Sequence, residues 1–244
     1  TLVGRGNTFP KASDFNKKAI MTAKNWGSSD FSICTGNSIK AVALNPNDLH
    51  DPVAGDALEG NDLIVFADGG VNKYRYSMTV NNMDDAPRHE LLECIDTSVH
   101  FPSSGAYSAM SIIAHLNDNG IPMNKIENRG NATISIKPID EEYRPALLSL
   151  VRMLVPDQFN VRATGRTTID ISHPKLSKAA AVKHVLDNGV KSVTFIGDEF
   201  AHGNDSPILE MNDERVKCVN VKSPAETALF LTALQLKQHE SYRG

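Results

Sequence analysis

The stretch Phe195–Asp205, with the sequence FIGDEFAHGND, decides the expected fold of this chain. The apolar, β-branched residues 192–196 predict a buried strand, which ends at a Gly-Asp corner. Ligands of open α/β sheets bind beyond the carboxyl ends of the strands. Carboxylates at that position suit a hard cation such as Mg²⁺, which takes oxygen ligands. Asp198 and Asp205 are therefore candidate metal ligands, with a Gly/Asp-rich surface loop as the alternative interpretation.

Strands and helices are expected to alternate at both ends of the chain. Apolar runs bounded by turn residues predict strands at 31–35, 63–67, 167–171, 192–196 and 216–221. Amphipathic runs predict helices at 13–26, 38–44, 177–188 and 224–237, and a short helix that begins at Ser206. This rhythm favours a parallel sheet covered by helices.

The middle of the chain has a different pattern. Polar and apolar residues alternate at 74–79, 98–101, 132–137 and 159–163, as in half-buried antiparallel strands. Two helices are expected between them, at 106–117 and 141–154. We therefore expect an α/β protein with a doubly wound, Rossmann-like parallel sheet core, formed by residues 1–79 and 166–244, and an inserted α+β cap domain at residues 80–165.

The composition excludes several classes of protein. Of the 244 residues, 41% are hydrophobic and 22% are charged, so a folded core is expected and disorder is not. The net charge of −4 gives no reason to expect nucleic acid or a membrane as a partner, and no apolar run is long enough to cross a bilayer. Three scattered cysteines and the lack of a signal-peptide pattern predict reduced thiols in a cytoplasmic protein. The sequence leaves the oligomeric state open.

Thr35-Gly36-Asn37 follows a predicted strand and precedes a predicted helix. Unpaired N–H groups and the helix dipole at such a turn favour an anion, and the threonine hydroxyl adds a further donor. The residues alone fit a simple helix cap at least as well.

Lys178 is expected in the first turn of a helix, where its charge opposes the helix dipole. Helix stability does not explain a lysine there, but a neighbouring phosphate would. An exposed lysine is the alternative, and Lys175 competes with Lys178 for the same role. His202 and Asn204 lie in the acidic loop, where His202 is a candidate for substrate contact with an exposed loop histidine as the alternative. Asp68 belongs to an Asp-Gly-Gly corner that could face the same edge, although the residues favour a simple turn.

These features occur together in the haloacid dehalogenase (HAD) superfamily of phosphoryl-transfer enzymes, which the chain resembles over almost its whole length. Thr35-Gly36-Asn37 resembles the second motif of that family and Lys178 the third. Gly197-Asp198 with Gly203-Asn204-Asp205 resembles the fourth. The inserted block lies where the type IIB cap of the Cof-type and phosphomannomutase-like branch would lie.

The resemblance implies Mg²⁺-dependent hydrolysis of a small phosphate monoester, such as a sugar phosphate, through an aspartyl-phosphate. The family's first motif, Asp-x-Asp-Gly-Thr-Leu, matches from Thr1 onward, so the nucleophile is expected just upstream of Thr1. Thr35 and Lys178 would be catalytic and would bind phosphate. Asp198 would hold the metal with the support of Asp205. Gly36, Asn37 and Asn204 would also contact the phosphate.

Two alternatives remain beside the phosphatase. A phosphomannomutase-like sugar phosphomutase would grip a second phosphate with cap residues, for which Arg129 and Lys137 are candidates, and Asp170 matches an aspartate of that branch. Asp140-Glu141 stands where that branch carries another arginine, which favours the phosphatase. The other alternative is a non-catalytic HAD-like protein that lacks the nucleophile.

Overall fold

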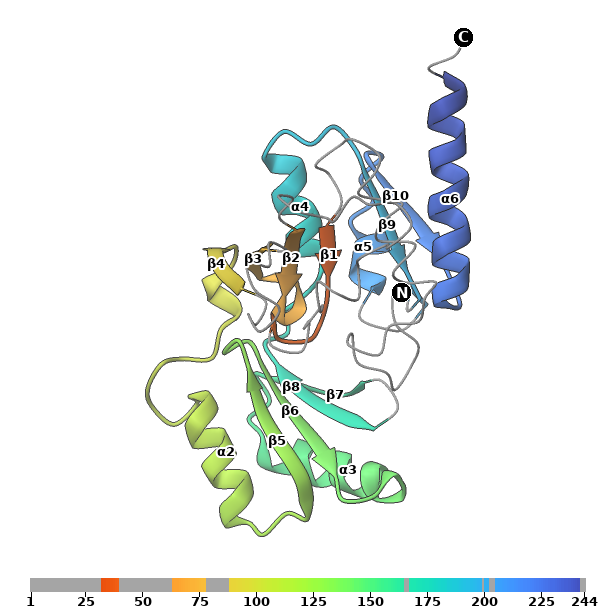
Figure 1. Ribbon diagram of the computed structural model, residues 1–244. Helices are drawn as coiled ribbons and strands as arrows, with labels where there is room; N and C mark the ends of the chain where they lie inside the picture. The colour runs from red at the N-terminus through yellow and green to blue at the C-terminus, as the bar shows by residue number, and fades with distance from the viewer. Residues whose placement is uncertain are drawn as a thin grey trace.

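The computed structural model describes residues 32–39, 63–77, 88–164, 167–198, 200–201 and 205–241. Figure 1 shows two regions, an upper one in which sheets and helices alternate and a lower one in which a sheet covers two helices. The helix expected at 13–26 lies outside the described residues, and so does the helix expected at 38–44 beyond residue 39.

The upper region contains two pairs of parallel strands. In the first pair β1 (Ser32–Cys34) lies beside β2 (Leu63–Ala67), and the sheet continues antiparallel through β3 (Asn72–Ser77) and β4 (Arg88–Cys94). The second pair joins β9 (Val193–Gly197) to β10 (Val216–Asn220). The apolar run of β2 is almost completely buried, which a strand covered on both faces requires. The expected α/β class with parallel strands is confirmed.

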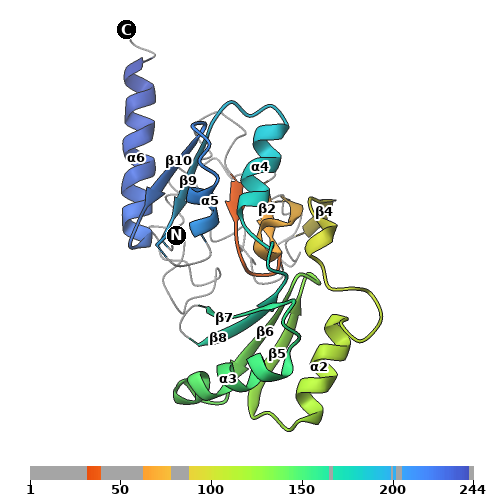
Figure 2. The same cartoon turned by 180° about the vertical axis from the view of Figure 1, so that it is seen from behind.

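Three helices accompany these strands: α4 (Ala179–Asp187), α5 (Ser206–Glu210) and α6 (Pro224–Ser241). Val182 and Leu186 on one face of α4 pack with Phe200 and Ile208 in a common apolar cluster. Helix α6 runs beyond the sheet, with the carboxyl end of the chain at its far end (Figures 1 and 2). None of the helices in the described ranges combines the length and apolarity needed to span a bilayer.

The lower region is an antiparallel sheet with helices on one face. Its strands are β5 (Met123–Arg129), β6 (Thr133–Pro138), β7 (Asn160–Thr164) and β8 (Thr168–Ser172), in the order β5-β6-β8-β7. Helices α2 (Ala109–Asp118) and α3 (Arg144–Leu154) pack on the isoleucines of this sheet, Ile134, Ile136, Ile169 and Ile171. Successive side chains of a strand point to opposite faces. The intervening residues, such as Ser135 and Asp170, therefore point toward the upper region (Figures 1 and 2).

The strand expected at 167–171 is present as β8, but it does not belong to the parallel sheet. It pairs antiparallel with β6 and β7 instead. Its sequence Thr-Ile-Asp-Ile-Ser alternates, so it has one apolar face for the helices and one polar face, which suits the lower sheet. The division of the chain into domains at residues 80 and 165 stays a prediction.

Three other segments of the middle also differ from expectation. Residues 98–101 are not a strand: Thr97–Val99 form a 3₁₀ turn, in which Asp96 accepts a hydrogen bond of 2.9 Å from the Ser98 N–H. Strands β4 and β5 were not predicted, because both are rich in charged residues and lack a clear apolar alternation. Each lies at the edge of its sheet, where charged side chains are tolerated in solvent.

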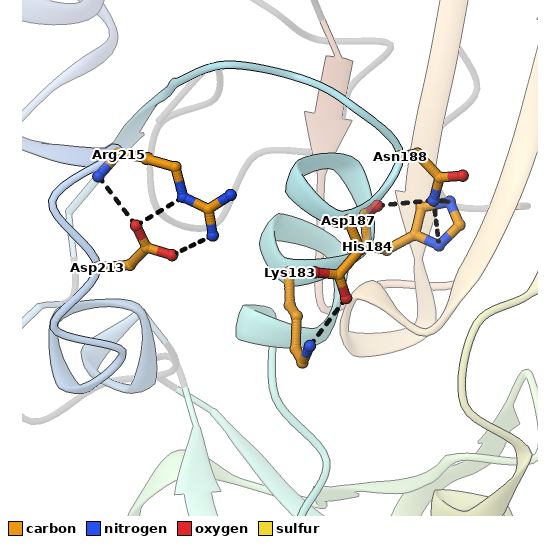
Figure 3. Close-up of polar contacts among 6 residues, drawn as sticks. All are labelled: Lys183, His184, Asp187, Asn188, Asp213 and Arg215. Atoms are coloured by element: carbon orange, nitrogen blue, oxygen red, sulfur yellow. Dashed lines mark hydrogen bonds and ion pairs between the residues drawn. The ribbon is translucent and has the colours of Figure 1, made fainter.

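Helix α4 is fixed on the upper sheet by His184. The imidazole lies edge-on to Phe66 and 3.3 Å from Glu93 Oε2 of β4. Figure 3 shows the next turn of the helix, where Asn188 caps the carboxyl end by donating a 2.8 Å hydrogen bond to the His184 carbonyl. The same figure shows the exposed pair Asp213–Arg215 before β10, in which hydrogen bonds from Arg215 lower the pKa of Asp213 to about 2. Fixing α4 also fixes Lys178, which directly precedes it.

Candidate active site

The Thr35 loop continues β1 and is tied to the neighbouring turn Asp68–Gly70 after β2. The Thr35 N–H donates to the Phe66 carbonyl at 2.8 Å, and the Asn37 N–H donates to Thr35 Oγ1 at 3.1 Å. In return, the Asp68 N–H donates to the Asn37 carbonyl at 2.9 Å and the Gly69 N–H to the Thr35 carbonyl at 3.1 Å. The last two bonds join the two loops at the carboxyl ends of parallel strands, while the first joins Thr35 to β2 and the second stabilises the Thr35 loop itself.

Lys178 reaches this edge because Gly70, which has no side chain, lets the backbone at Lys178 come close to the turn after β2. A Cβ at Gly70 would lie 3.1 Å from Lys178 Cα and 3.3 Å from Cys34 Sγ. Gly70 also has φ +93°, a conformation that side chains other than glycine rarely adopt. The start of α4 therefore lies directly against the end of β1.

Lys178 forms an ion pair with Asp205 at the start of α5. Its Nζ lies 2.6 Å from Asp205 Oδ1, and the two side chains are only 12% and 2% exposed. The other carboxylate oxygen of Asp205 lies against Gly197, where a Cβ would overlap it. Asp198 follows Gly197 directly, so the corner after β9 belongs to the same edge.

The electrostatics of Cys34 support the closeness of these groups. Burial raises the pKa of the Cys34 thiol to about 12, the Lys178 ammonium opposes this rise, and the Asp205 carboxylate adds to it. Cys34 is therefore a neutral thiol at neutral pH, and the charges of the site reside on the lysine and the aspartates.

The structure thus brings Thr35, Gly36, Asn37, Lys178, Asp198 and Asp205 to one edge of the upper region. Lys178 rather than Lys175 lies there, since Lys175 is exposed. Asn204 and His202 lie outside the described residues. The chemical roles of all these residues stay predictions.

The three remaining candidates lie on the lower sheet. Asp170 accepts hydrogen bonds from Ser135 Oγ at 2.5 Å and from Thr164 Oγ1 at 2.7 Å, so both carboxylate oxygens are engaged. Lys137 lies on β6 on the same face as Ser135, by the alternation of the strand. Arg129 ends β5, is 14% exposed and lies 3.9 Å from Glu127. A hydrogen bond from Lys125 lowers the pKa of Glu127. All three lie on the lower sheet, but Arg129 is near Asp68 beside the Thr35 loop, where its charge opposes the rise that burial causes in the pKa of Asp68.

Asp68, for which the sequence favours a turn over a place at this edge, is a buried residue, and this burial is what sequence reasoning missed. It is 1% exposed and has φ +55°. Its Oδ2 accepts hydrogen bonds from Asn72 Nδ2 at 2.9 Å and from the Tyr74 hydroxyl at 3.4 Å. Burial raises the pKa of Asp68, and burial beside this carboxyl raises the pKa of Tyr74 to about 12. The Asp-Gly-Gly sequence signals a turn but contains no sign of burial.

The donor chemistry of the edge fits a hard cation. Asp198 and Asp205 supply carboxylate oxygens at the end of β9, and Mg²⁺ is bound through one or two carboxylates while it keeps several waters. Among the residues that the structure describes, no three His, Cys, Asp or Glu side chains are grouped as metal ligands. Asp198 is the better candidate ligand, because it directly follows β9 at the strand end, whereas Asp205 lies further along at the start of α5.

No model of a protein family and no curated protein matches this sequence. Solved structures do match. A trehalose-6-phosphate phosphatase related protein has 15% identity and a TM-score of 0.58, with 99% of this chain and 96% of that chain covered. An N-terminal truncated, IMP-bound IMP-nucleotidase of Plasmodium falciparum has 15% identity and a TM-score of 0.57, with 96% and 65% covered. A haloacid dehalogenase-like hydrolase from Bacteroides thetaiotaomicron has 14% identity and a TM-score of 0.53, with 93% and 88% covered.

The match extends over nearly all of this chain, although the chain spans less than two thirds of the IMP-nucleotidase. At such low sequence identity, the likeness to these proteins concerns the fold alone. The expected Rossmann-like core is part of that likeness. In its fold, this chain resembles a haloacid dehalogenase-like hydrolase, a trehalose-6-phosphate phosphatase related protein and an IMP-nucleotidase.

Proposed function

We propose that this protein hydrolyses a small phosphate monoester, such as a sugar phosphate, in a Mg²⁺-dependent reaction. The observation that carries the proposal is the Lys178–Asp205 ion pair beside the Thr35 loop. A largely buried ammonium at the ends of parallel strands needs a function beyond surface solvation, and a phosphate beside it supplies one. The fold is shared with proteins named as a phosphatase-related protein and a nucleotidase, which supports a phosphate ester as the substrate class.

In this proposal the chain's own residues neutralise the transferring phosphoryl group. Lys178 and the Thr35 hydroxyl bind its oxygens, together with the backbone N–H of Gly36 and the side chain of Asn37. Asp205 orients the lysine, which its 2.6 Å contact with Nζ suits well. Such positioning and charge stabilisation are the main tasks in phosphoryl transfer. Asn204 is proposed to contact the same phosphate.

Asp198 is the proposed metal ligand. The cation would supply positive charge that neutralises the phosphate oxygens during transfer. The site itself would contribute carboxylate oxygens at the end of β9. Lys178 and the Thr35 loop lie beside the ends of β1 and β2, the other pair of parallel strands.

The reaction also needs a nucleophilic carboxylate, and the strand arrangement indicates where it would enter. In the described part of the chain, β1 pairs only with β2, and β9 pairs only with β10. An extended segment that pairs with the other sides of β1 and β9 would end beside Thr35 and Asp198. An aspartate at its end could attack phosphorus, release the alcohol and form an aspartyl-phosphate, which water then hydrolyses.

The direct test is an assay of the complete polypeptide. We expect release of inorganic phosphate from members of a panel of sugar phosphates and nucleoside monophosphates, with Mg²⁺ present, and loss of this release on chelation. Isomerised sugar phosphate with little free phosphate would support a mutase instead. No turnover of any ester would support a non-catalytic protein.

Replacement of Asp198 by asparagine is expected to raise the Mg²⁺ concentration for half-maximal activity by about 100-fold, because a metal ligand loses its charge. Titration of the initial rate with Mg²⁺ measures the shift. Asp118→Asn is the control, because Asp118 is an exposed carboxylate at the end of α2. Equal Mg²⁺ dependence of the two variants would remove Asp198 from the metal site.

A further inference from the structure

The carboxyl of Asp68 lies under the turn that joins β5 to β6. This turn contains Gly130, whose φ is +54°, and a Cβ at Gly130 would overlap the Asp68 carboxyl. Asn131 beside it also has a positive φ of +58°. The lower sheet therefore touches the upper region through a backbone turn placed directly on a buried acid.

The same turn is fixed to the connection between the two regions. The Phe101 N–H donates to the Asn131 carbonyl, and Asn131 Nδ2 donates to the Phe101 carbonyl, both at 2.8 Å. Ala132 is fully buried with Val71 and Val99, and this small apolar cluster is completed by Leu176 and Ala180 at α4. The junction thus combines the turn after Asp68, the chain leading into the lower region, and the start of α4.

Asp68 links this junction to the candidate active site through its backbone. Its N–H donates to the Asn37 carbonyl of the Thr35 loop, and Gly69 donates to the Thr35 carbonyl. The backbone of the turn that carries the Asp68 carboxyl is therefore joined to the Thr35 loop by two hydrogen bonds.

The surroundings of the carboxyl are only partly polar. Asn72 and Tyr74 of β3 donate to Oδ2, whereas Oδ1 is buried with no hydrogen-bond partner among the residues that the structure describes. The charged or titratable groups that face it are Tyr74 of β3, Cys94 of β4, His100 after the 3₁₀ turn, and Arg129 of β5. Burial raises the pKa of Asp68 against the opposing effects of Asn72, Tyr74, His100 and Arg129. A buried carboxylate with one unpartnered oxygen is disfavoured relative to the neutral acid.

We propose that Asp68 is a positioning residue whose protonated carboxyl holds the β5–β6 turn against the Thr35 loop. Once this carboxyl ionises, the lower sheet is held less firmly over the site. The structural part of the proposal is independent of the proposed phosphatase. Its effect on catalysis rests on that function and concerns the regulation of the same site by pH.

The steric part is tested by Gly130→Ala, with Gly120→Ala as a matched control. Both glycines have a positive φ, +54° and +63°, so both variants suffer similar backbone strain, but nothing lies within 4 Å of a Cβ at Gly120. We expect Gly130→Ala to lower the folding equilibrium constant about 5- to 150-fold more than the control, the range for overpacked sites. Urea unfolding measures both constants.

A double-mutant cycle then identifies Asp68 as the cause. Asp68→Gly removes the carboxyl without strain at φ +55°. We expect most of the extra loss caused by Gly130→Ala to disappear in the Asp68→Gly background, because residues in direct contact are energetically coupled. The proposed contact between Asp68 and the β5–β6 turn would be overturned if the extra loss of folding equilibrium constant were unchanged in the Asp68→Gly background. Equal effects of Gly130→Ala and Gly120→Ala would also overturn it.

The protonation part is tested by Asp68→Asn, whose amide keeps the shape of the neutral acid and cannot ionise. A carboxyl whose pKa is raised on folding stabilises the native state fully below its unfolded pKa, about 3.9, and this contribution is lost as the pH rises through the folded pKa. The folding constant of the wild type should therefore fall relative to that of Asp68→Asn as the pH rises. Asp157→Asn, which alters an exposed carboxyl before β7, should keep the pH slope of the wild type.

Two further measurements separate the contact between Asp68 and the β5–β6 turn from the proposed catalysis. Hydrogen exchange of the Phe101 N–H, corrected for its intrinsic rate, should show less protection in the wild type as the pH rises and constant protection in Asp68→Asn. If the enzyme releases phosphate, kcat/KM of the wild type should fall over the same pH range relative to the variant. Parallel pH profiles of wild type and Asp68→Asn in exchange and unfolding would overturn the proposal, whether or not phosphate is released.

Discussion

Replacement of Lys178 by alanine is expected to reduce phosphate release by at least about 1,000-fold, because the transferring phosphoryl group loses its buried cation. The Lys178 side chain is only 12% exposed, and its Nζ lies 2.6 Å from Asp205 Oδ1. Its charge therefore sits in a buried position that an exposed lysine elsewhere does not occupy. The measurement is kcat and KM on the substrate found in the ester panel. We expect the loss mainly in kcat, since the cation acts on charge that develops during transfer.

The same substitution should also weaken the fold, which the sequence did not predict. Asp205 is 2% exposed and would lose its lysine, and removal of one partner from a buried pair costs about 3–5 kcal/mol. Unfolding in urea must therefore accompany the kinetics, and rates must be compared at a temperature where both proteins are folded. Lys175→Ala is the matched control, because this exposed lysine lies three residues earlier in the same segment. If Lys175→Ala were the inactive variant, Lys178 would be the wrong residue.

Replacement of Gly197 by alanine is expected to have the second large effect. The new Cβ would overlap Asp205 Oδ2 and lie 3.2 Å from the Phe195 ring. Asp205 must then shift, which breaks its contact with Lys178 and displaces the Asp198 corner. We expect destabilisation of about 1–3 kcal/mol from overpacking, together with loss of most phosphate release.

Gly189→Ala is a demanding control for this change. Gly189 has φ +93°, so alanine is strained there, but nothing lies within 4 Å of its Cβ. Gly189→Ala should therefore lose stability and keep its kcat, whereas Gly197→Ala should lose both. Normal turnover by a folded Gly197→Ala protein would show that the Asp205 position does not control the site.

The local sequence predicted the elements whose pattern is self-contained. Strands β2, β9 and β10 are runs rich in apolar, β-branched residues, which predict strands; β2 is almost completely buried, whereas β9 and β10 are mostly half-buried. The polar residues after these strands were expected at one edge, because parallel strands place their carboxyl ends together. Thr35 and Asp198, which follow β1 and β9, could therefore be expected near each other, whereas Lys178 follows the antiparallel β8 and was placed with them by its position at a helix start and by the resemblance to the third motif.

The sequence could not show what depends on partners far along the chain. β8 has the pattern of any half-buried strand, and its place in the lower sheet follows from pairing with β6 and β7. β4 and β5 lack a clear pattern because edge strands need only one paired side. Asp68 resembled a turn residue, since burial under Gly130 depends on a hairpin about sixty residues away.

The sequence by itself determined the parallel strand pairs and the polar residues at their carboxyl ends, because hydrophobic periodicity and turn chemistry act over a few neighbouring residues. The tertiary structure alone decided that Lys178 meets Asp205 and that Asp68 lies buried under Gly130. Those contacts join side chains that packing brings together from distant segments, and the energy of a buried charge depends on such packing rather than on the local sequence.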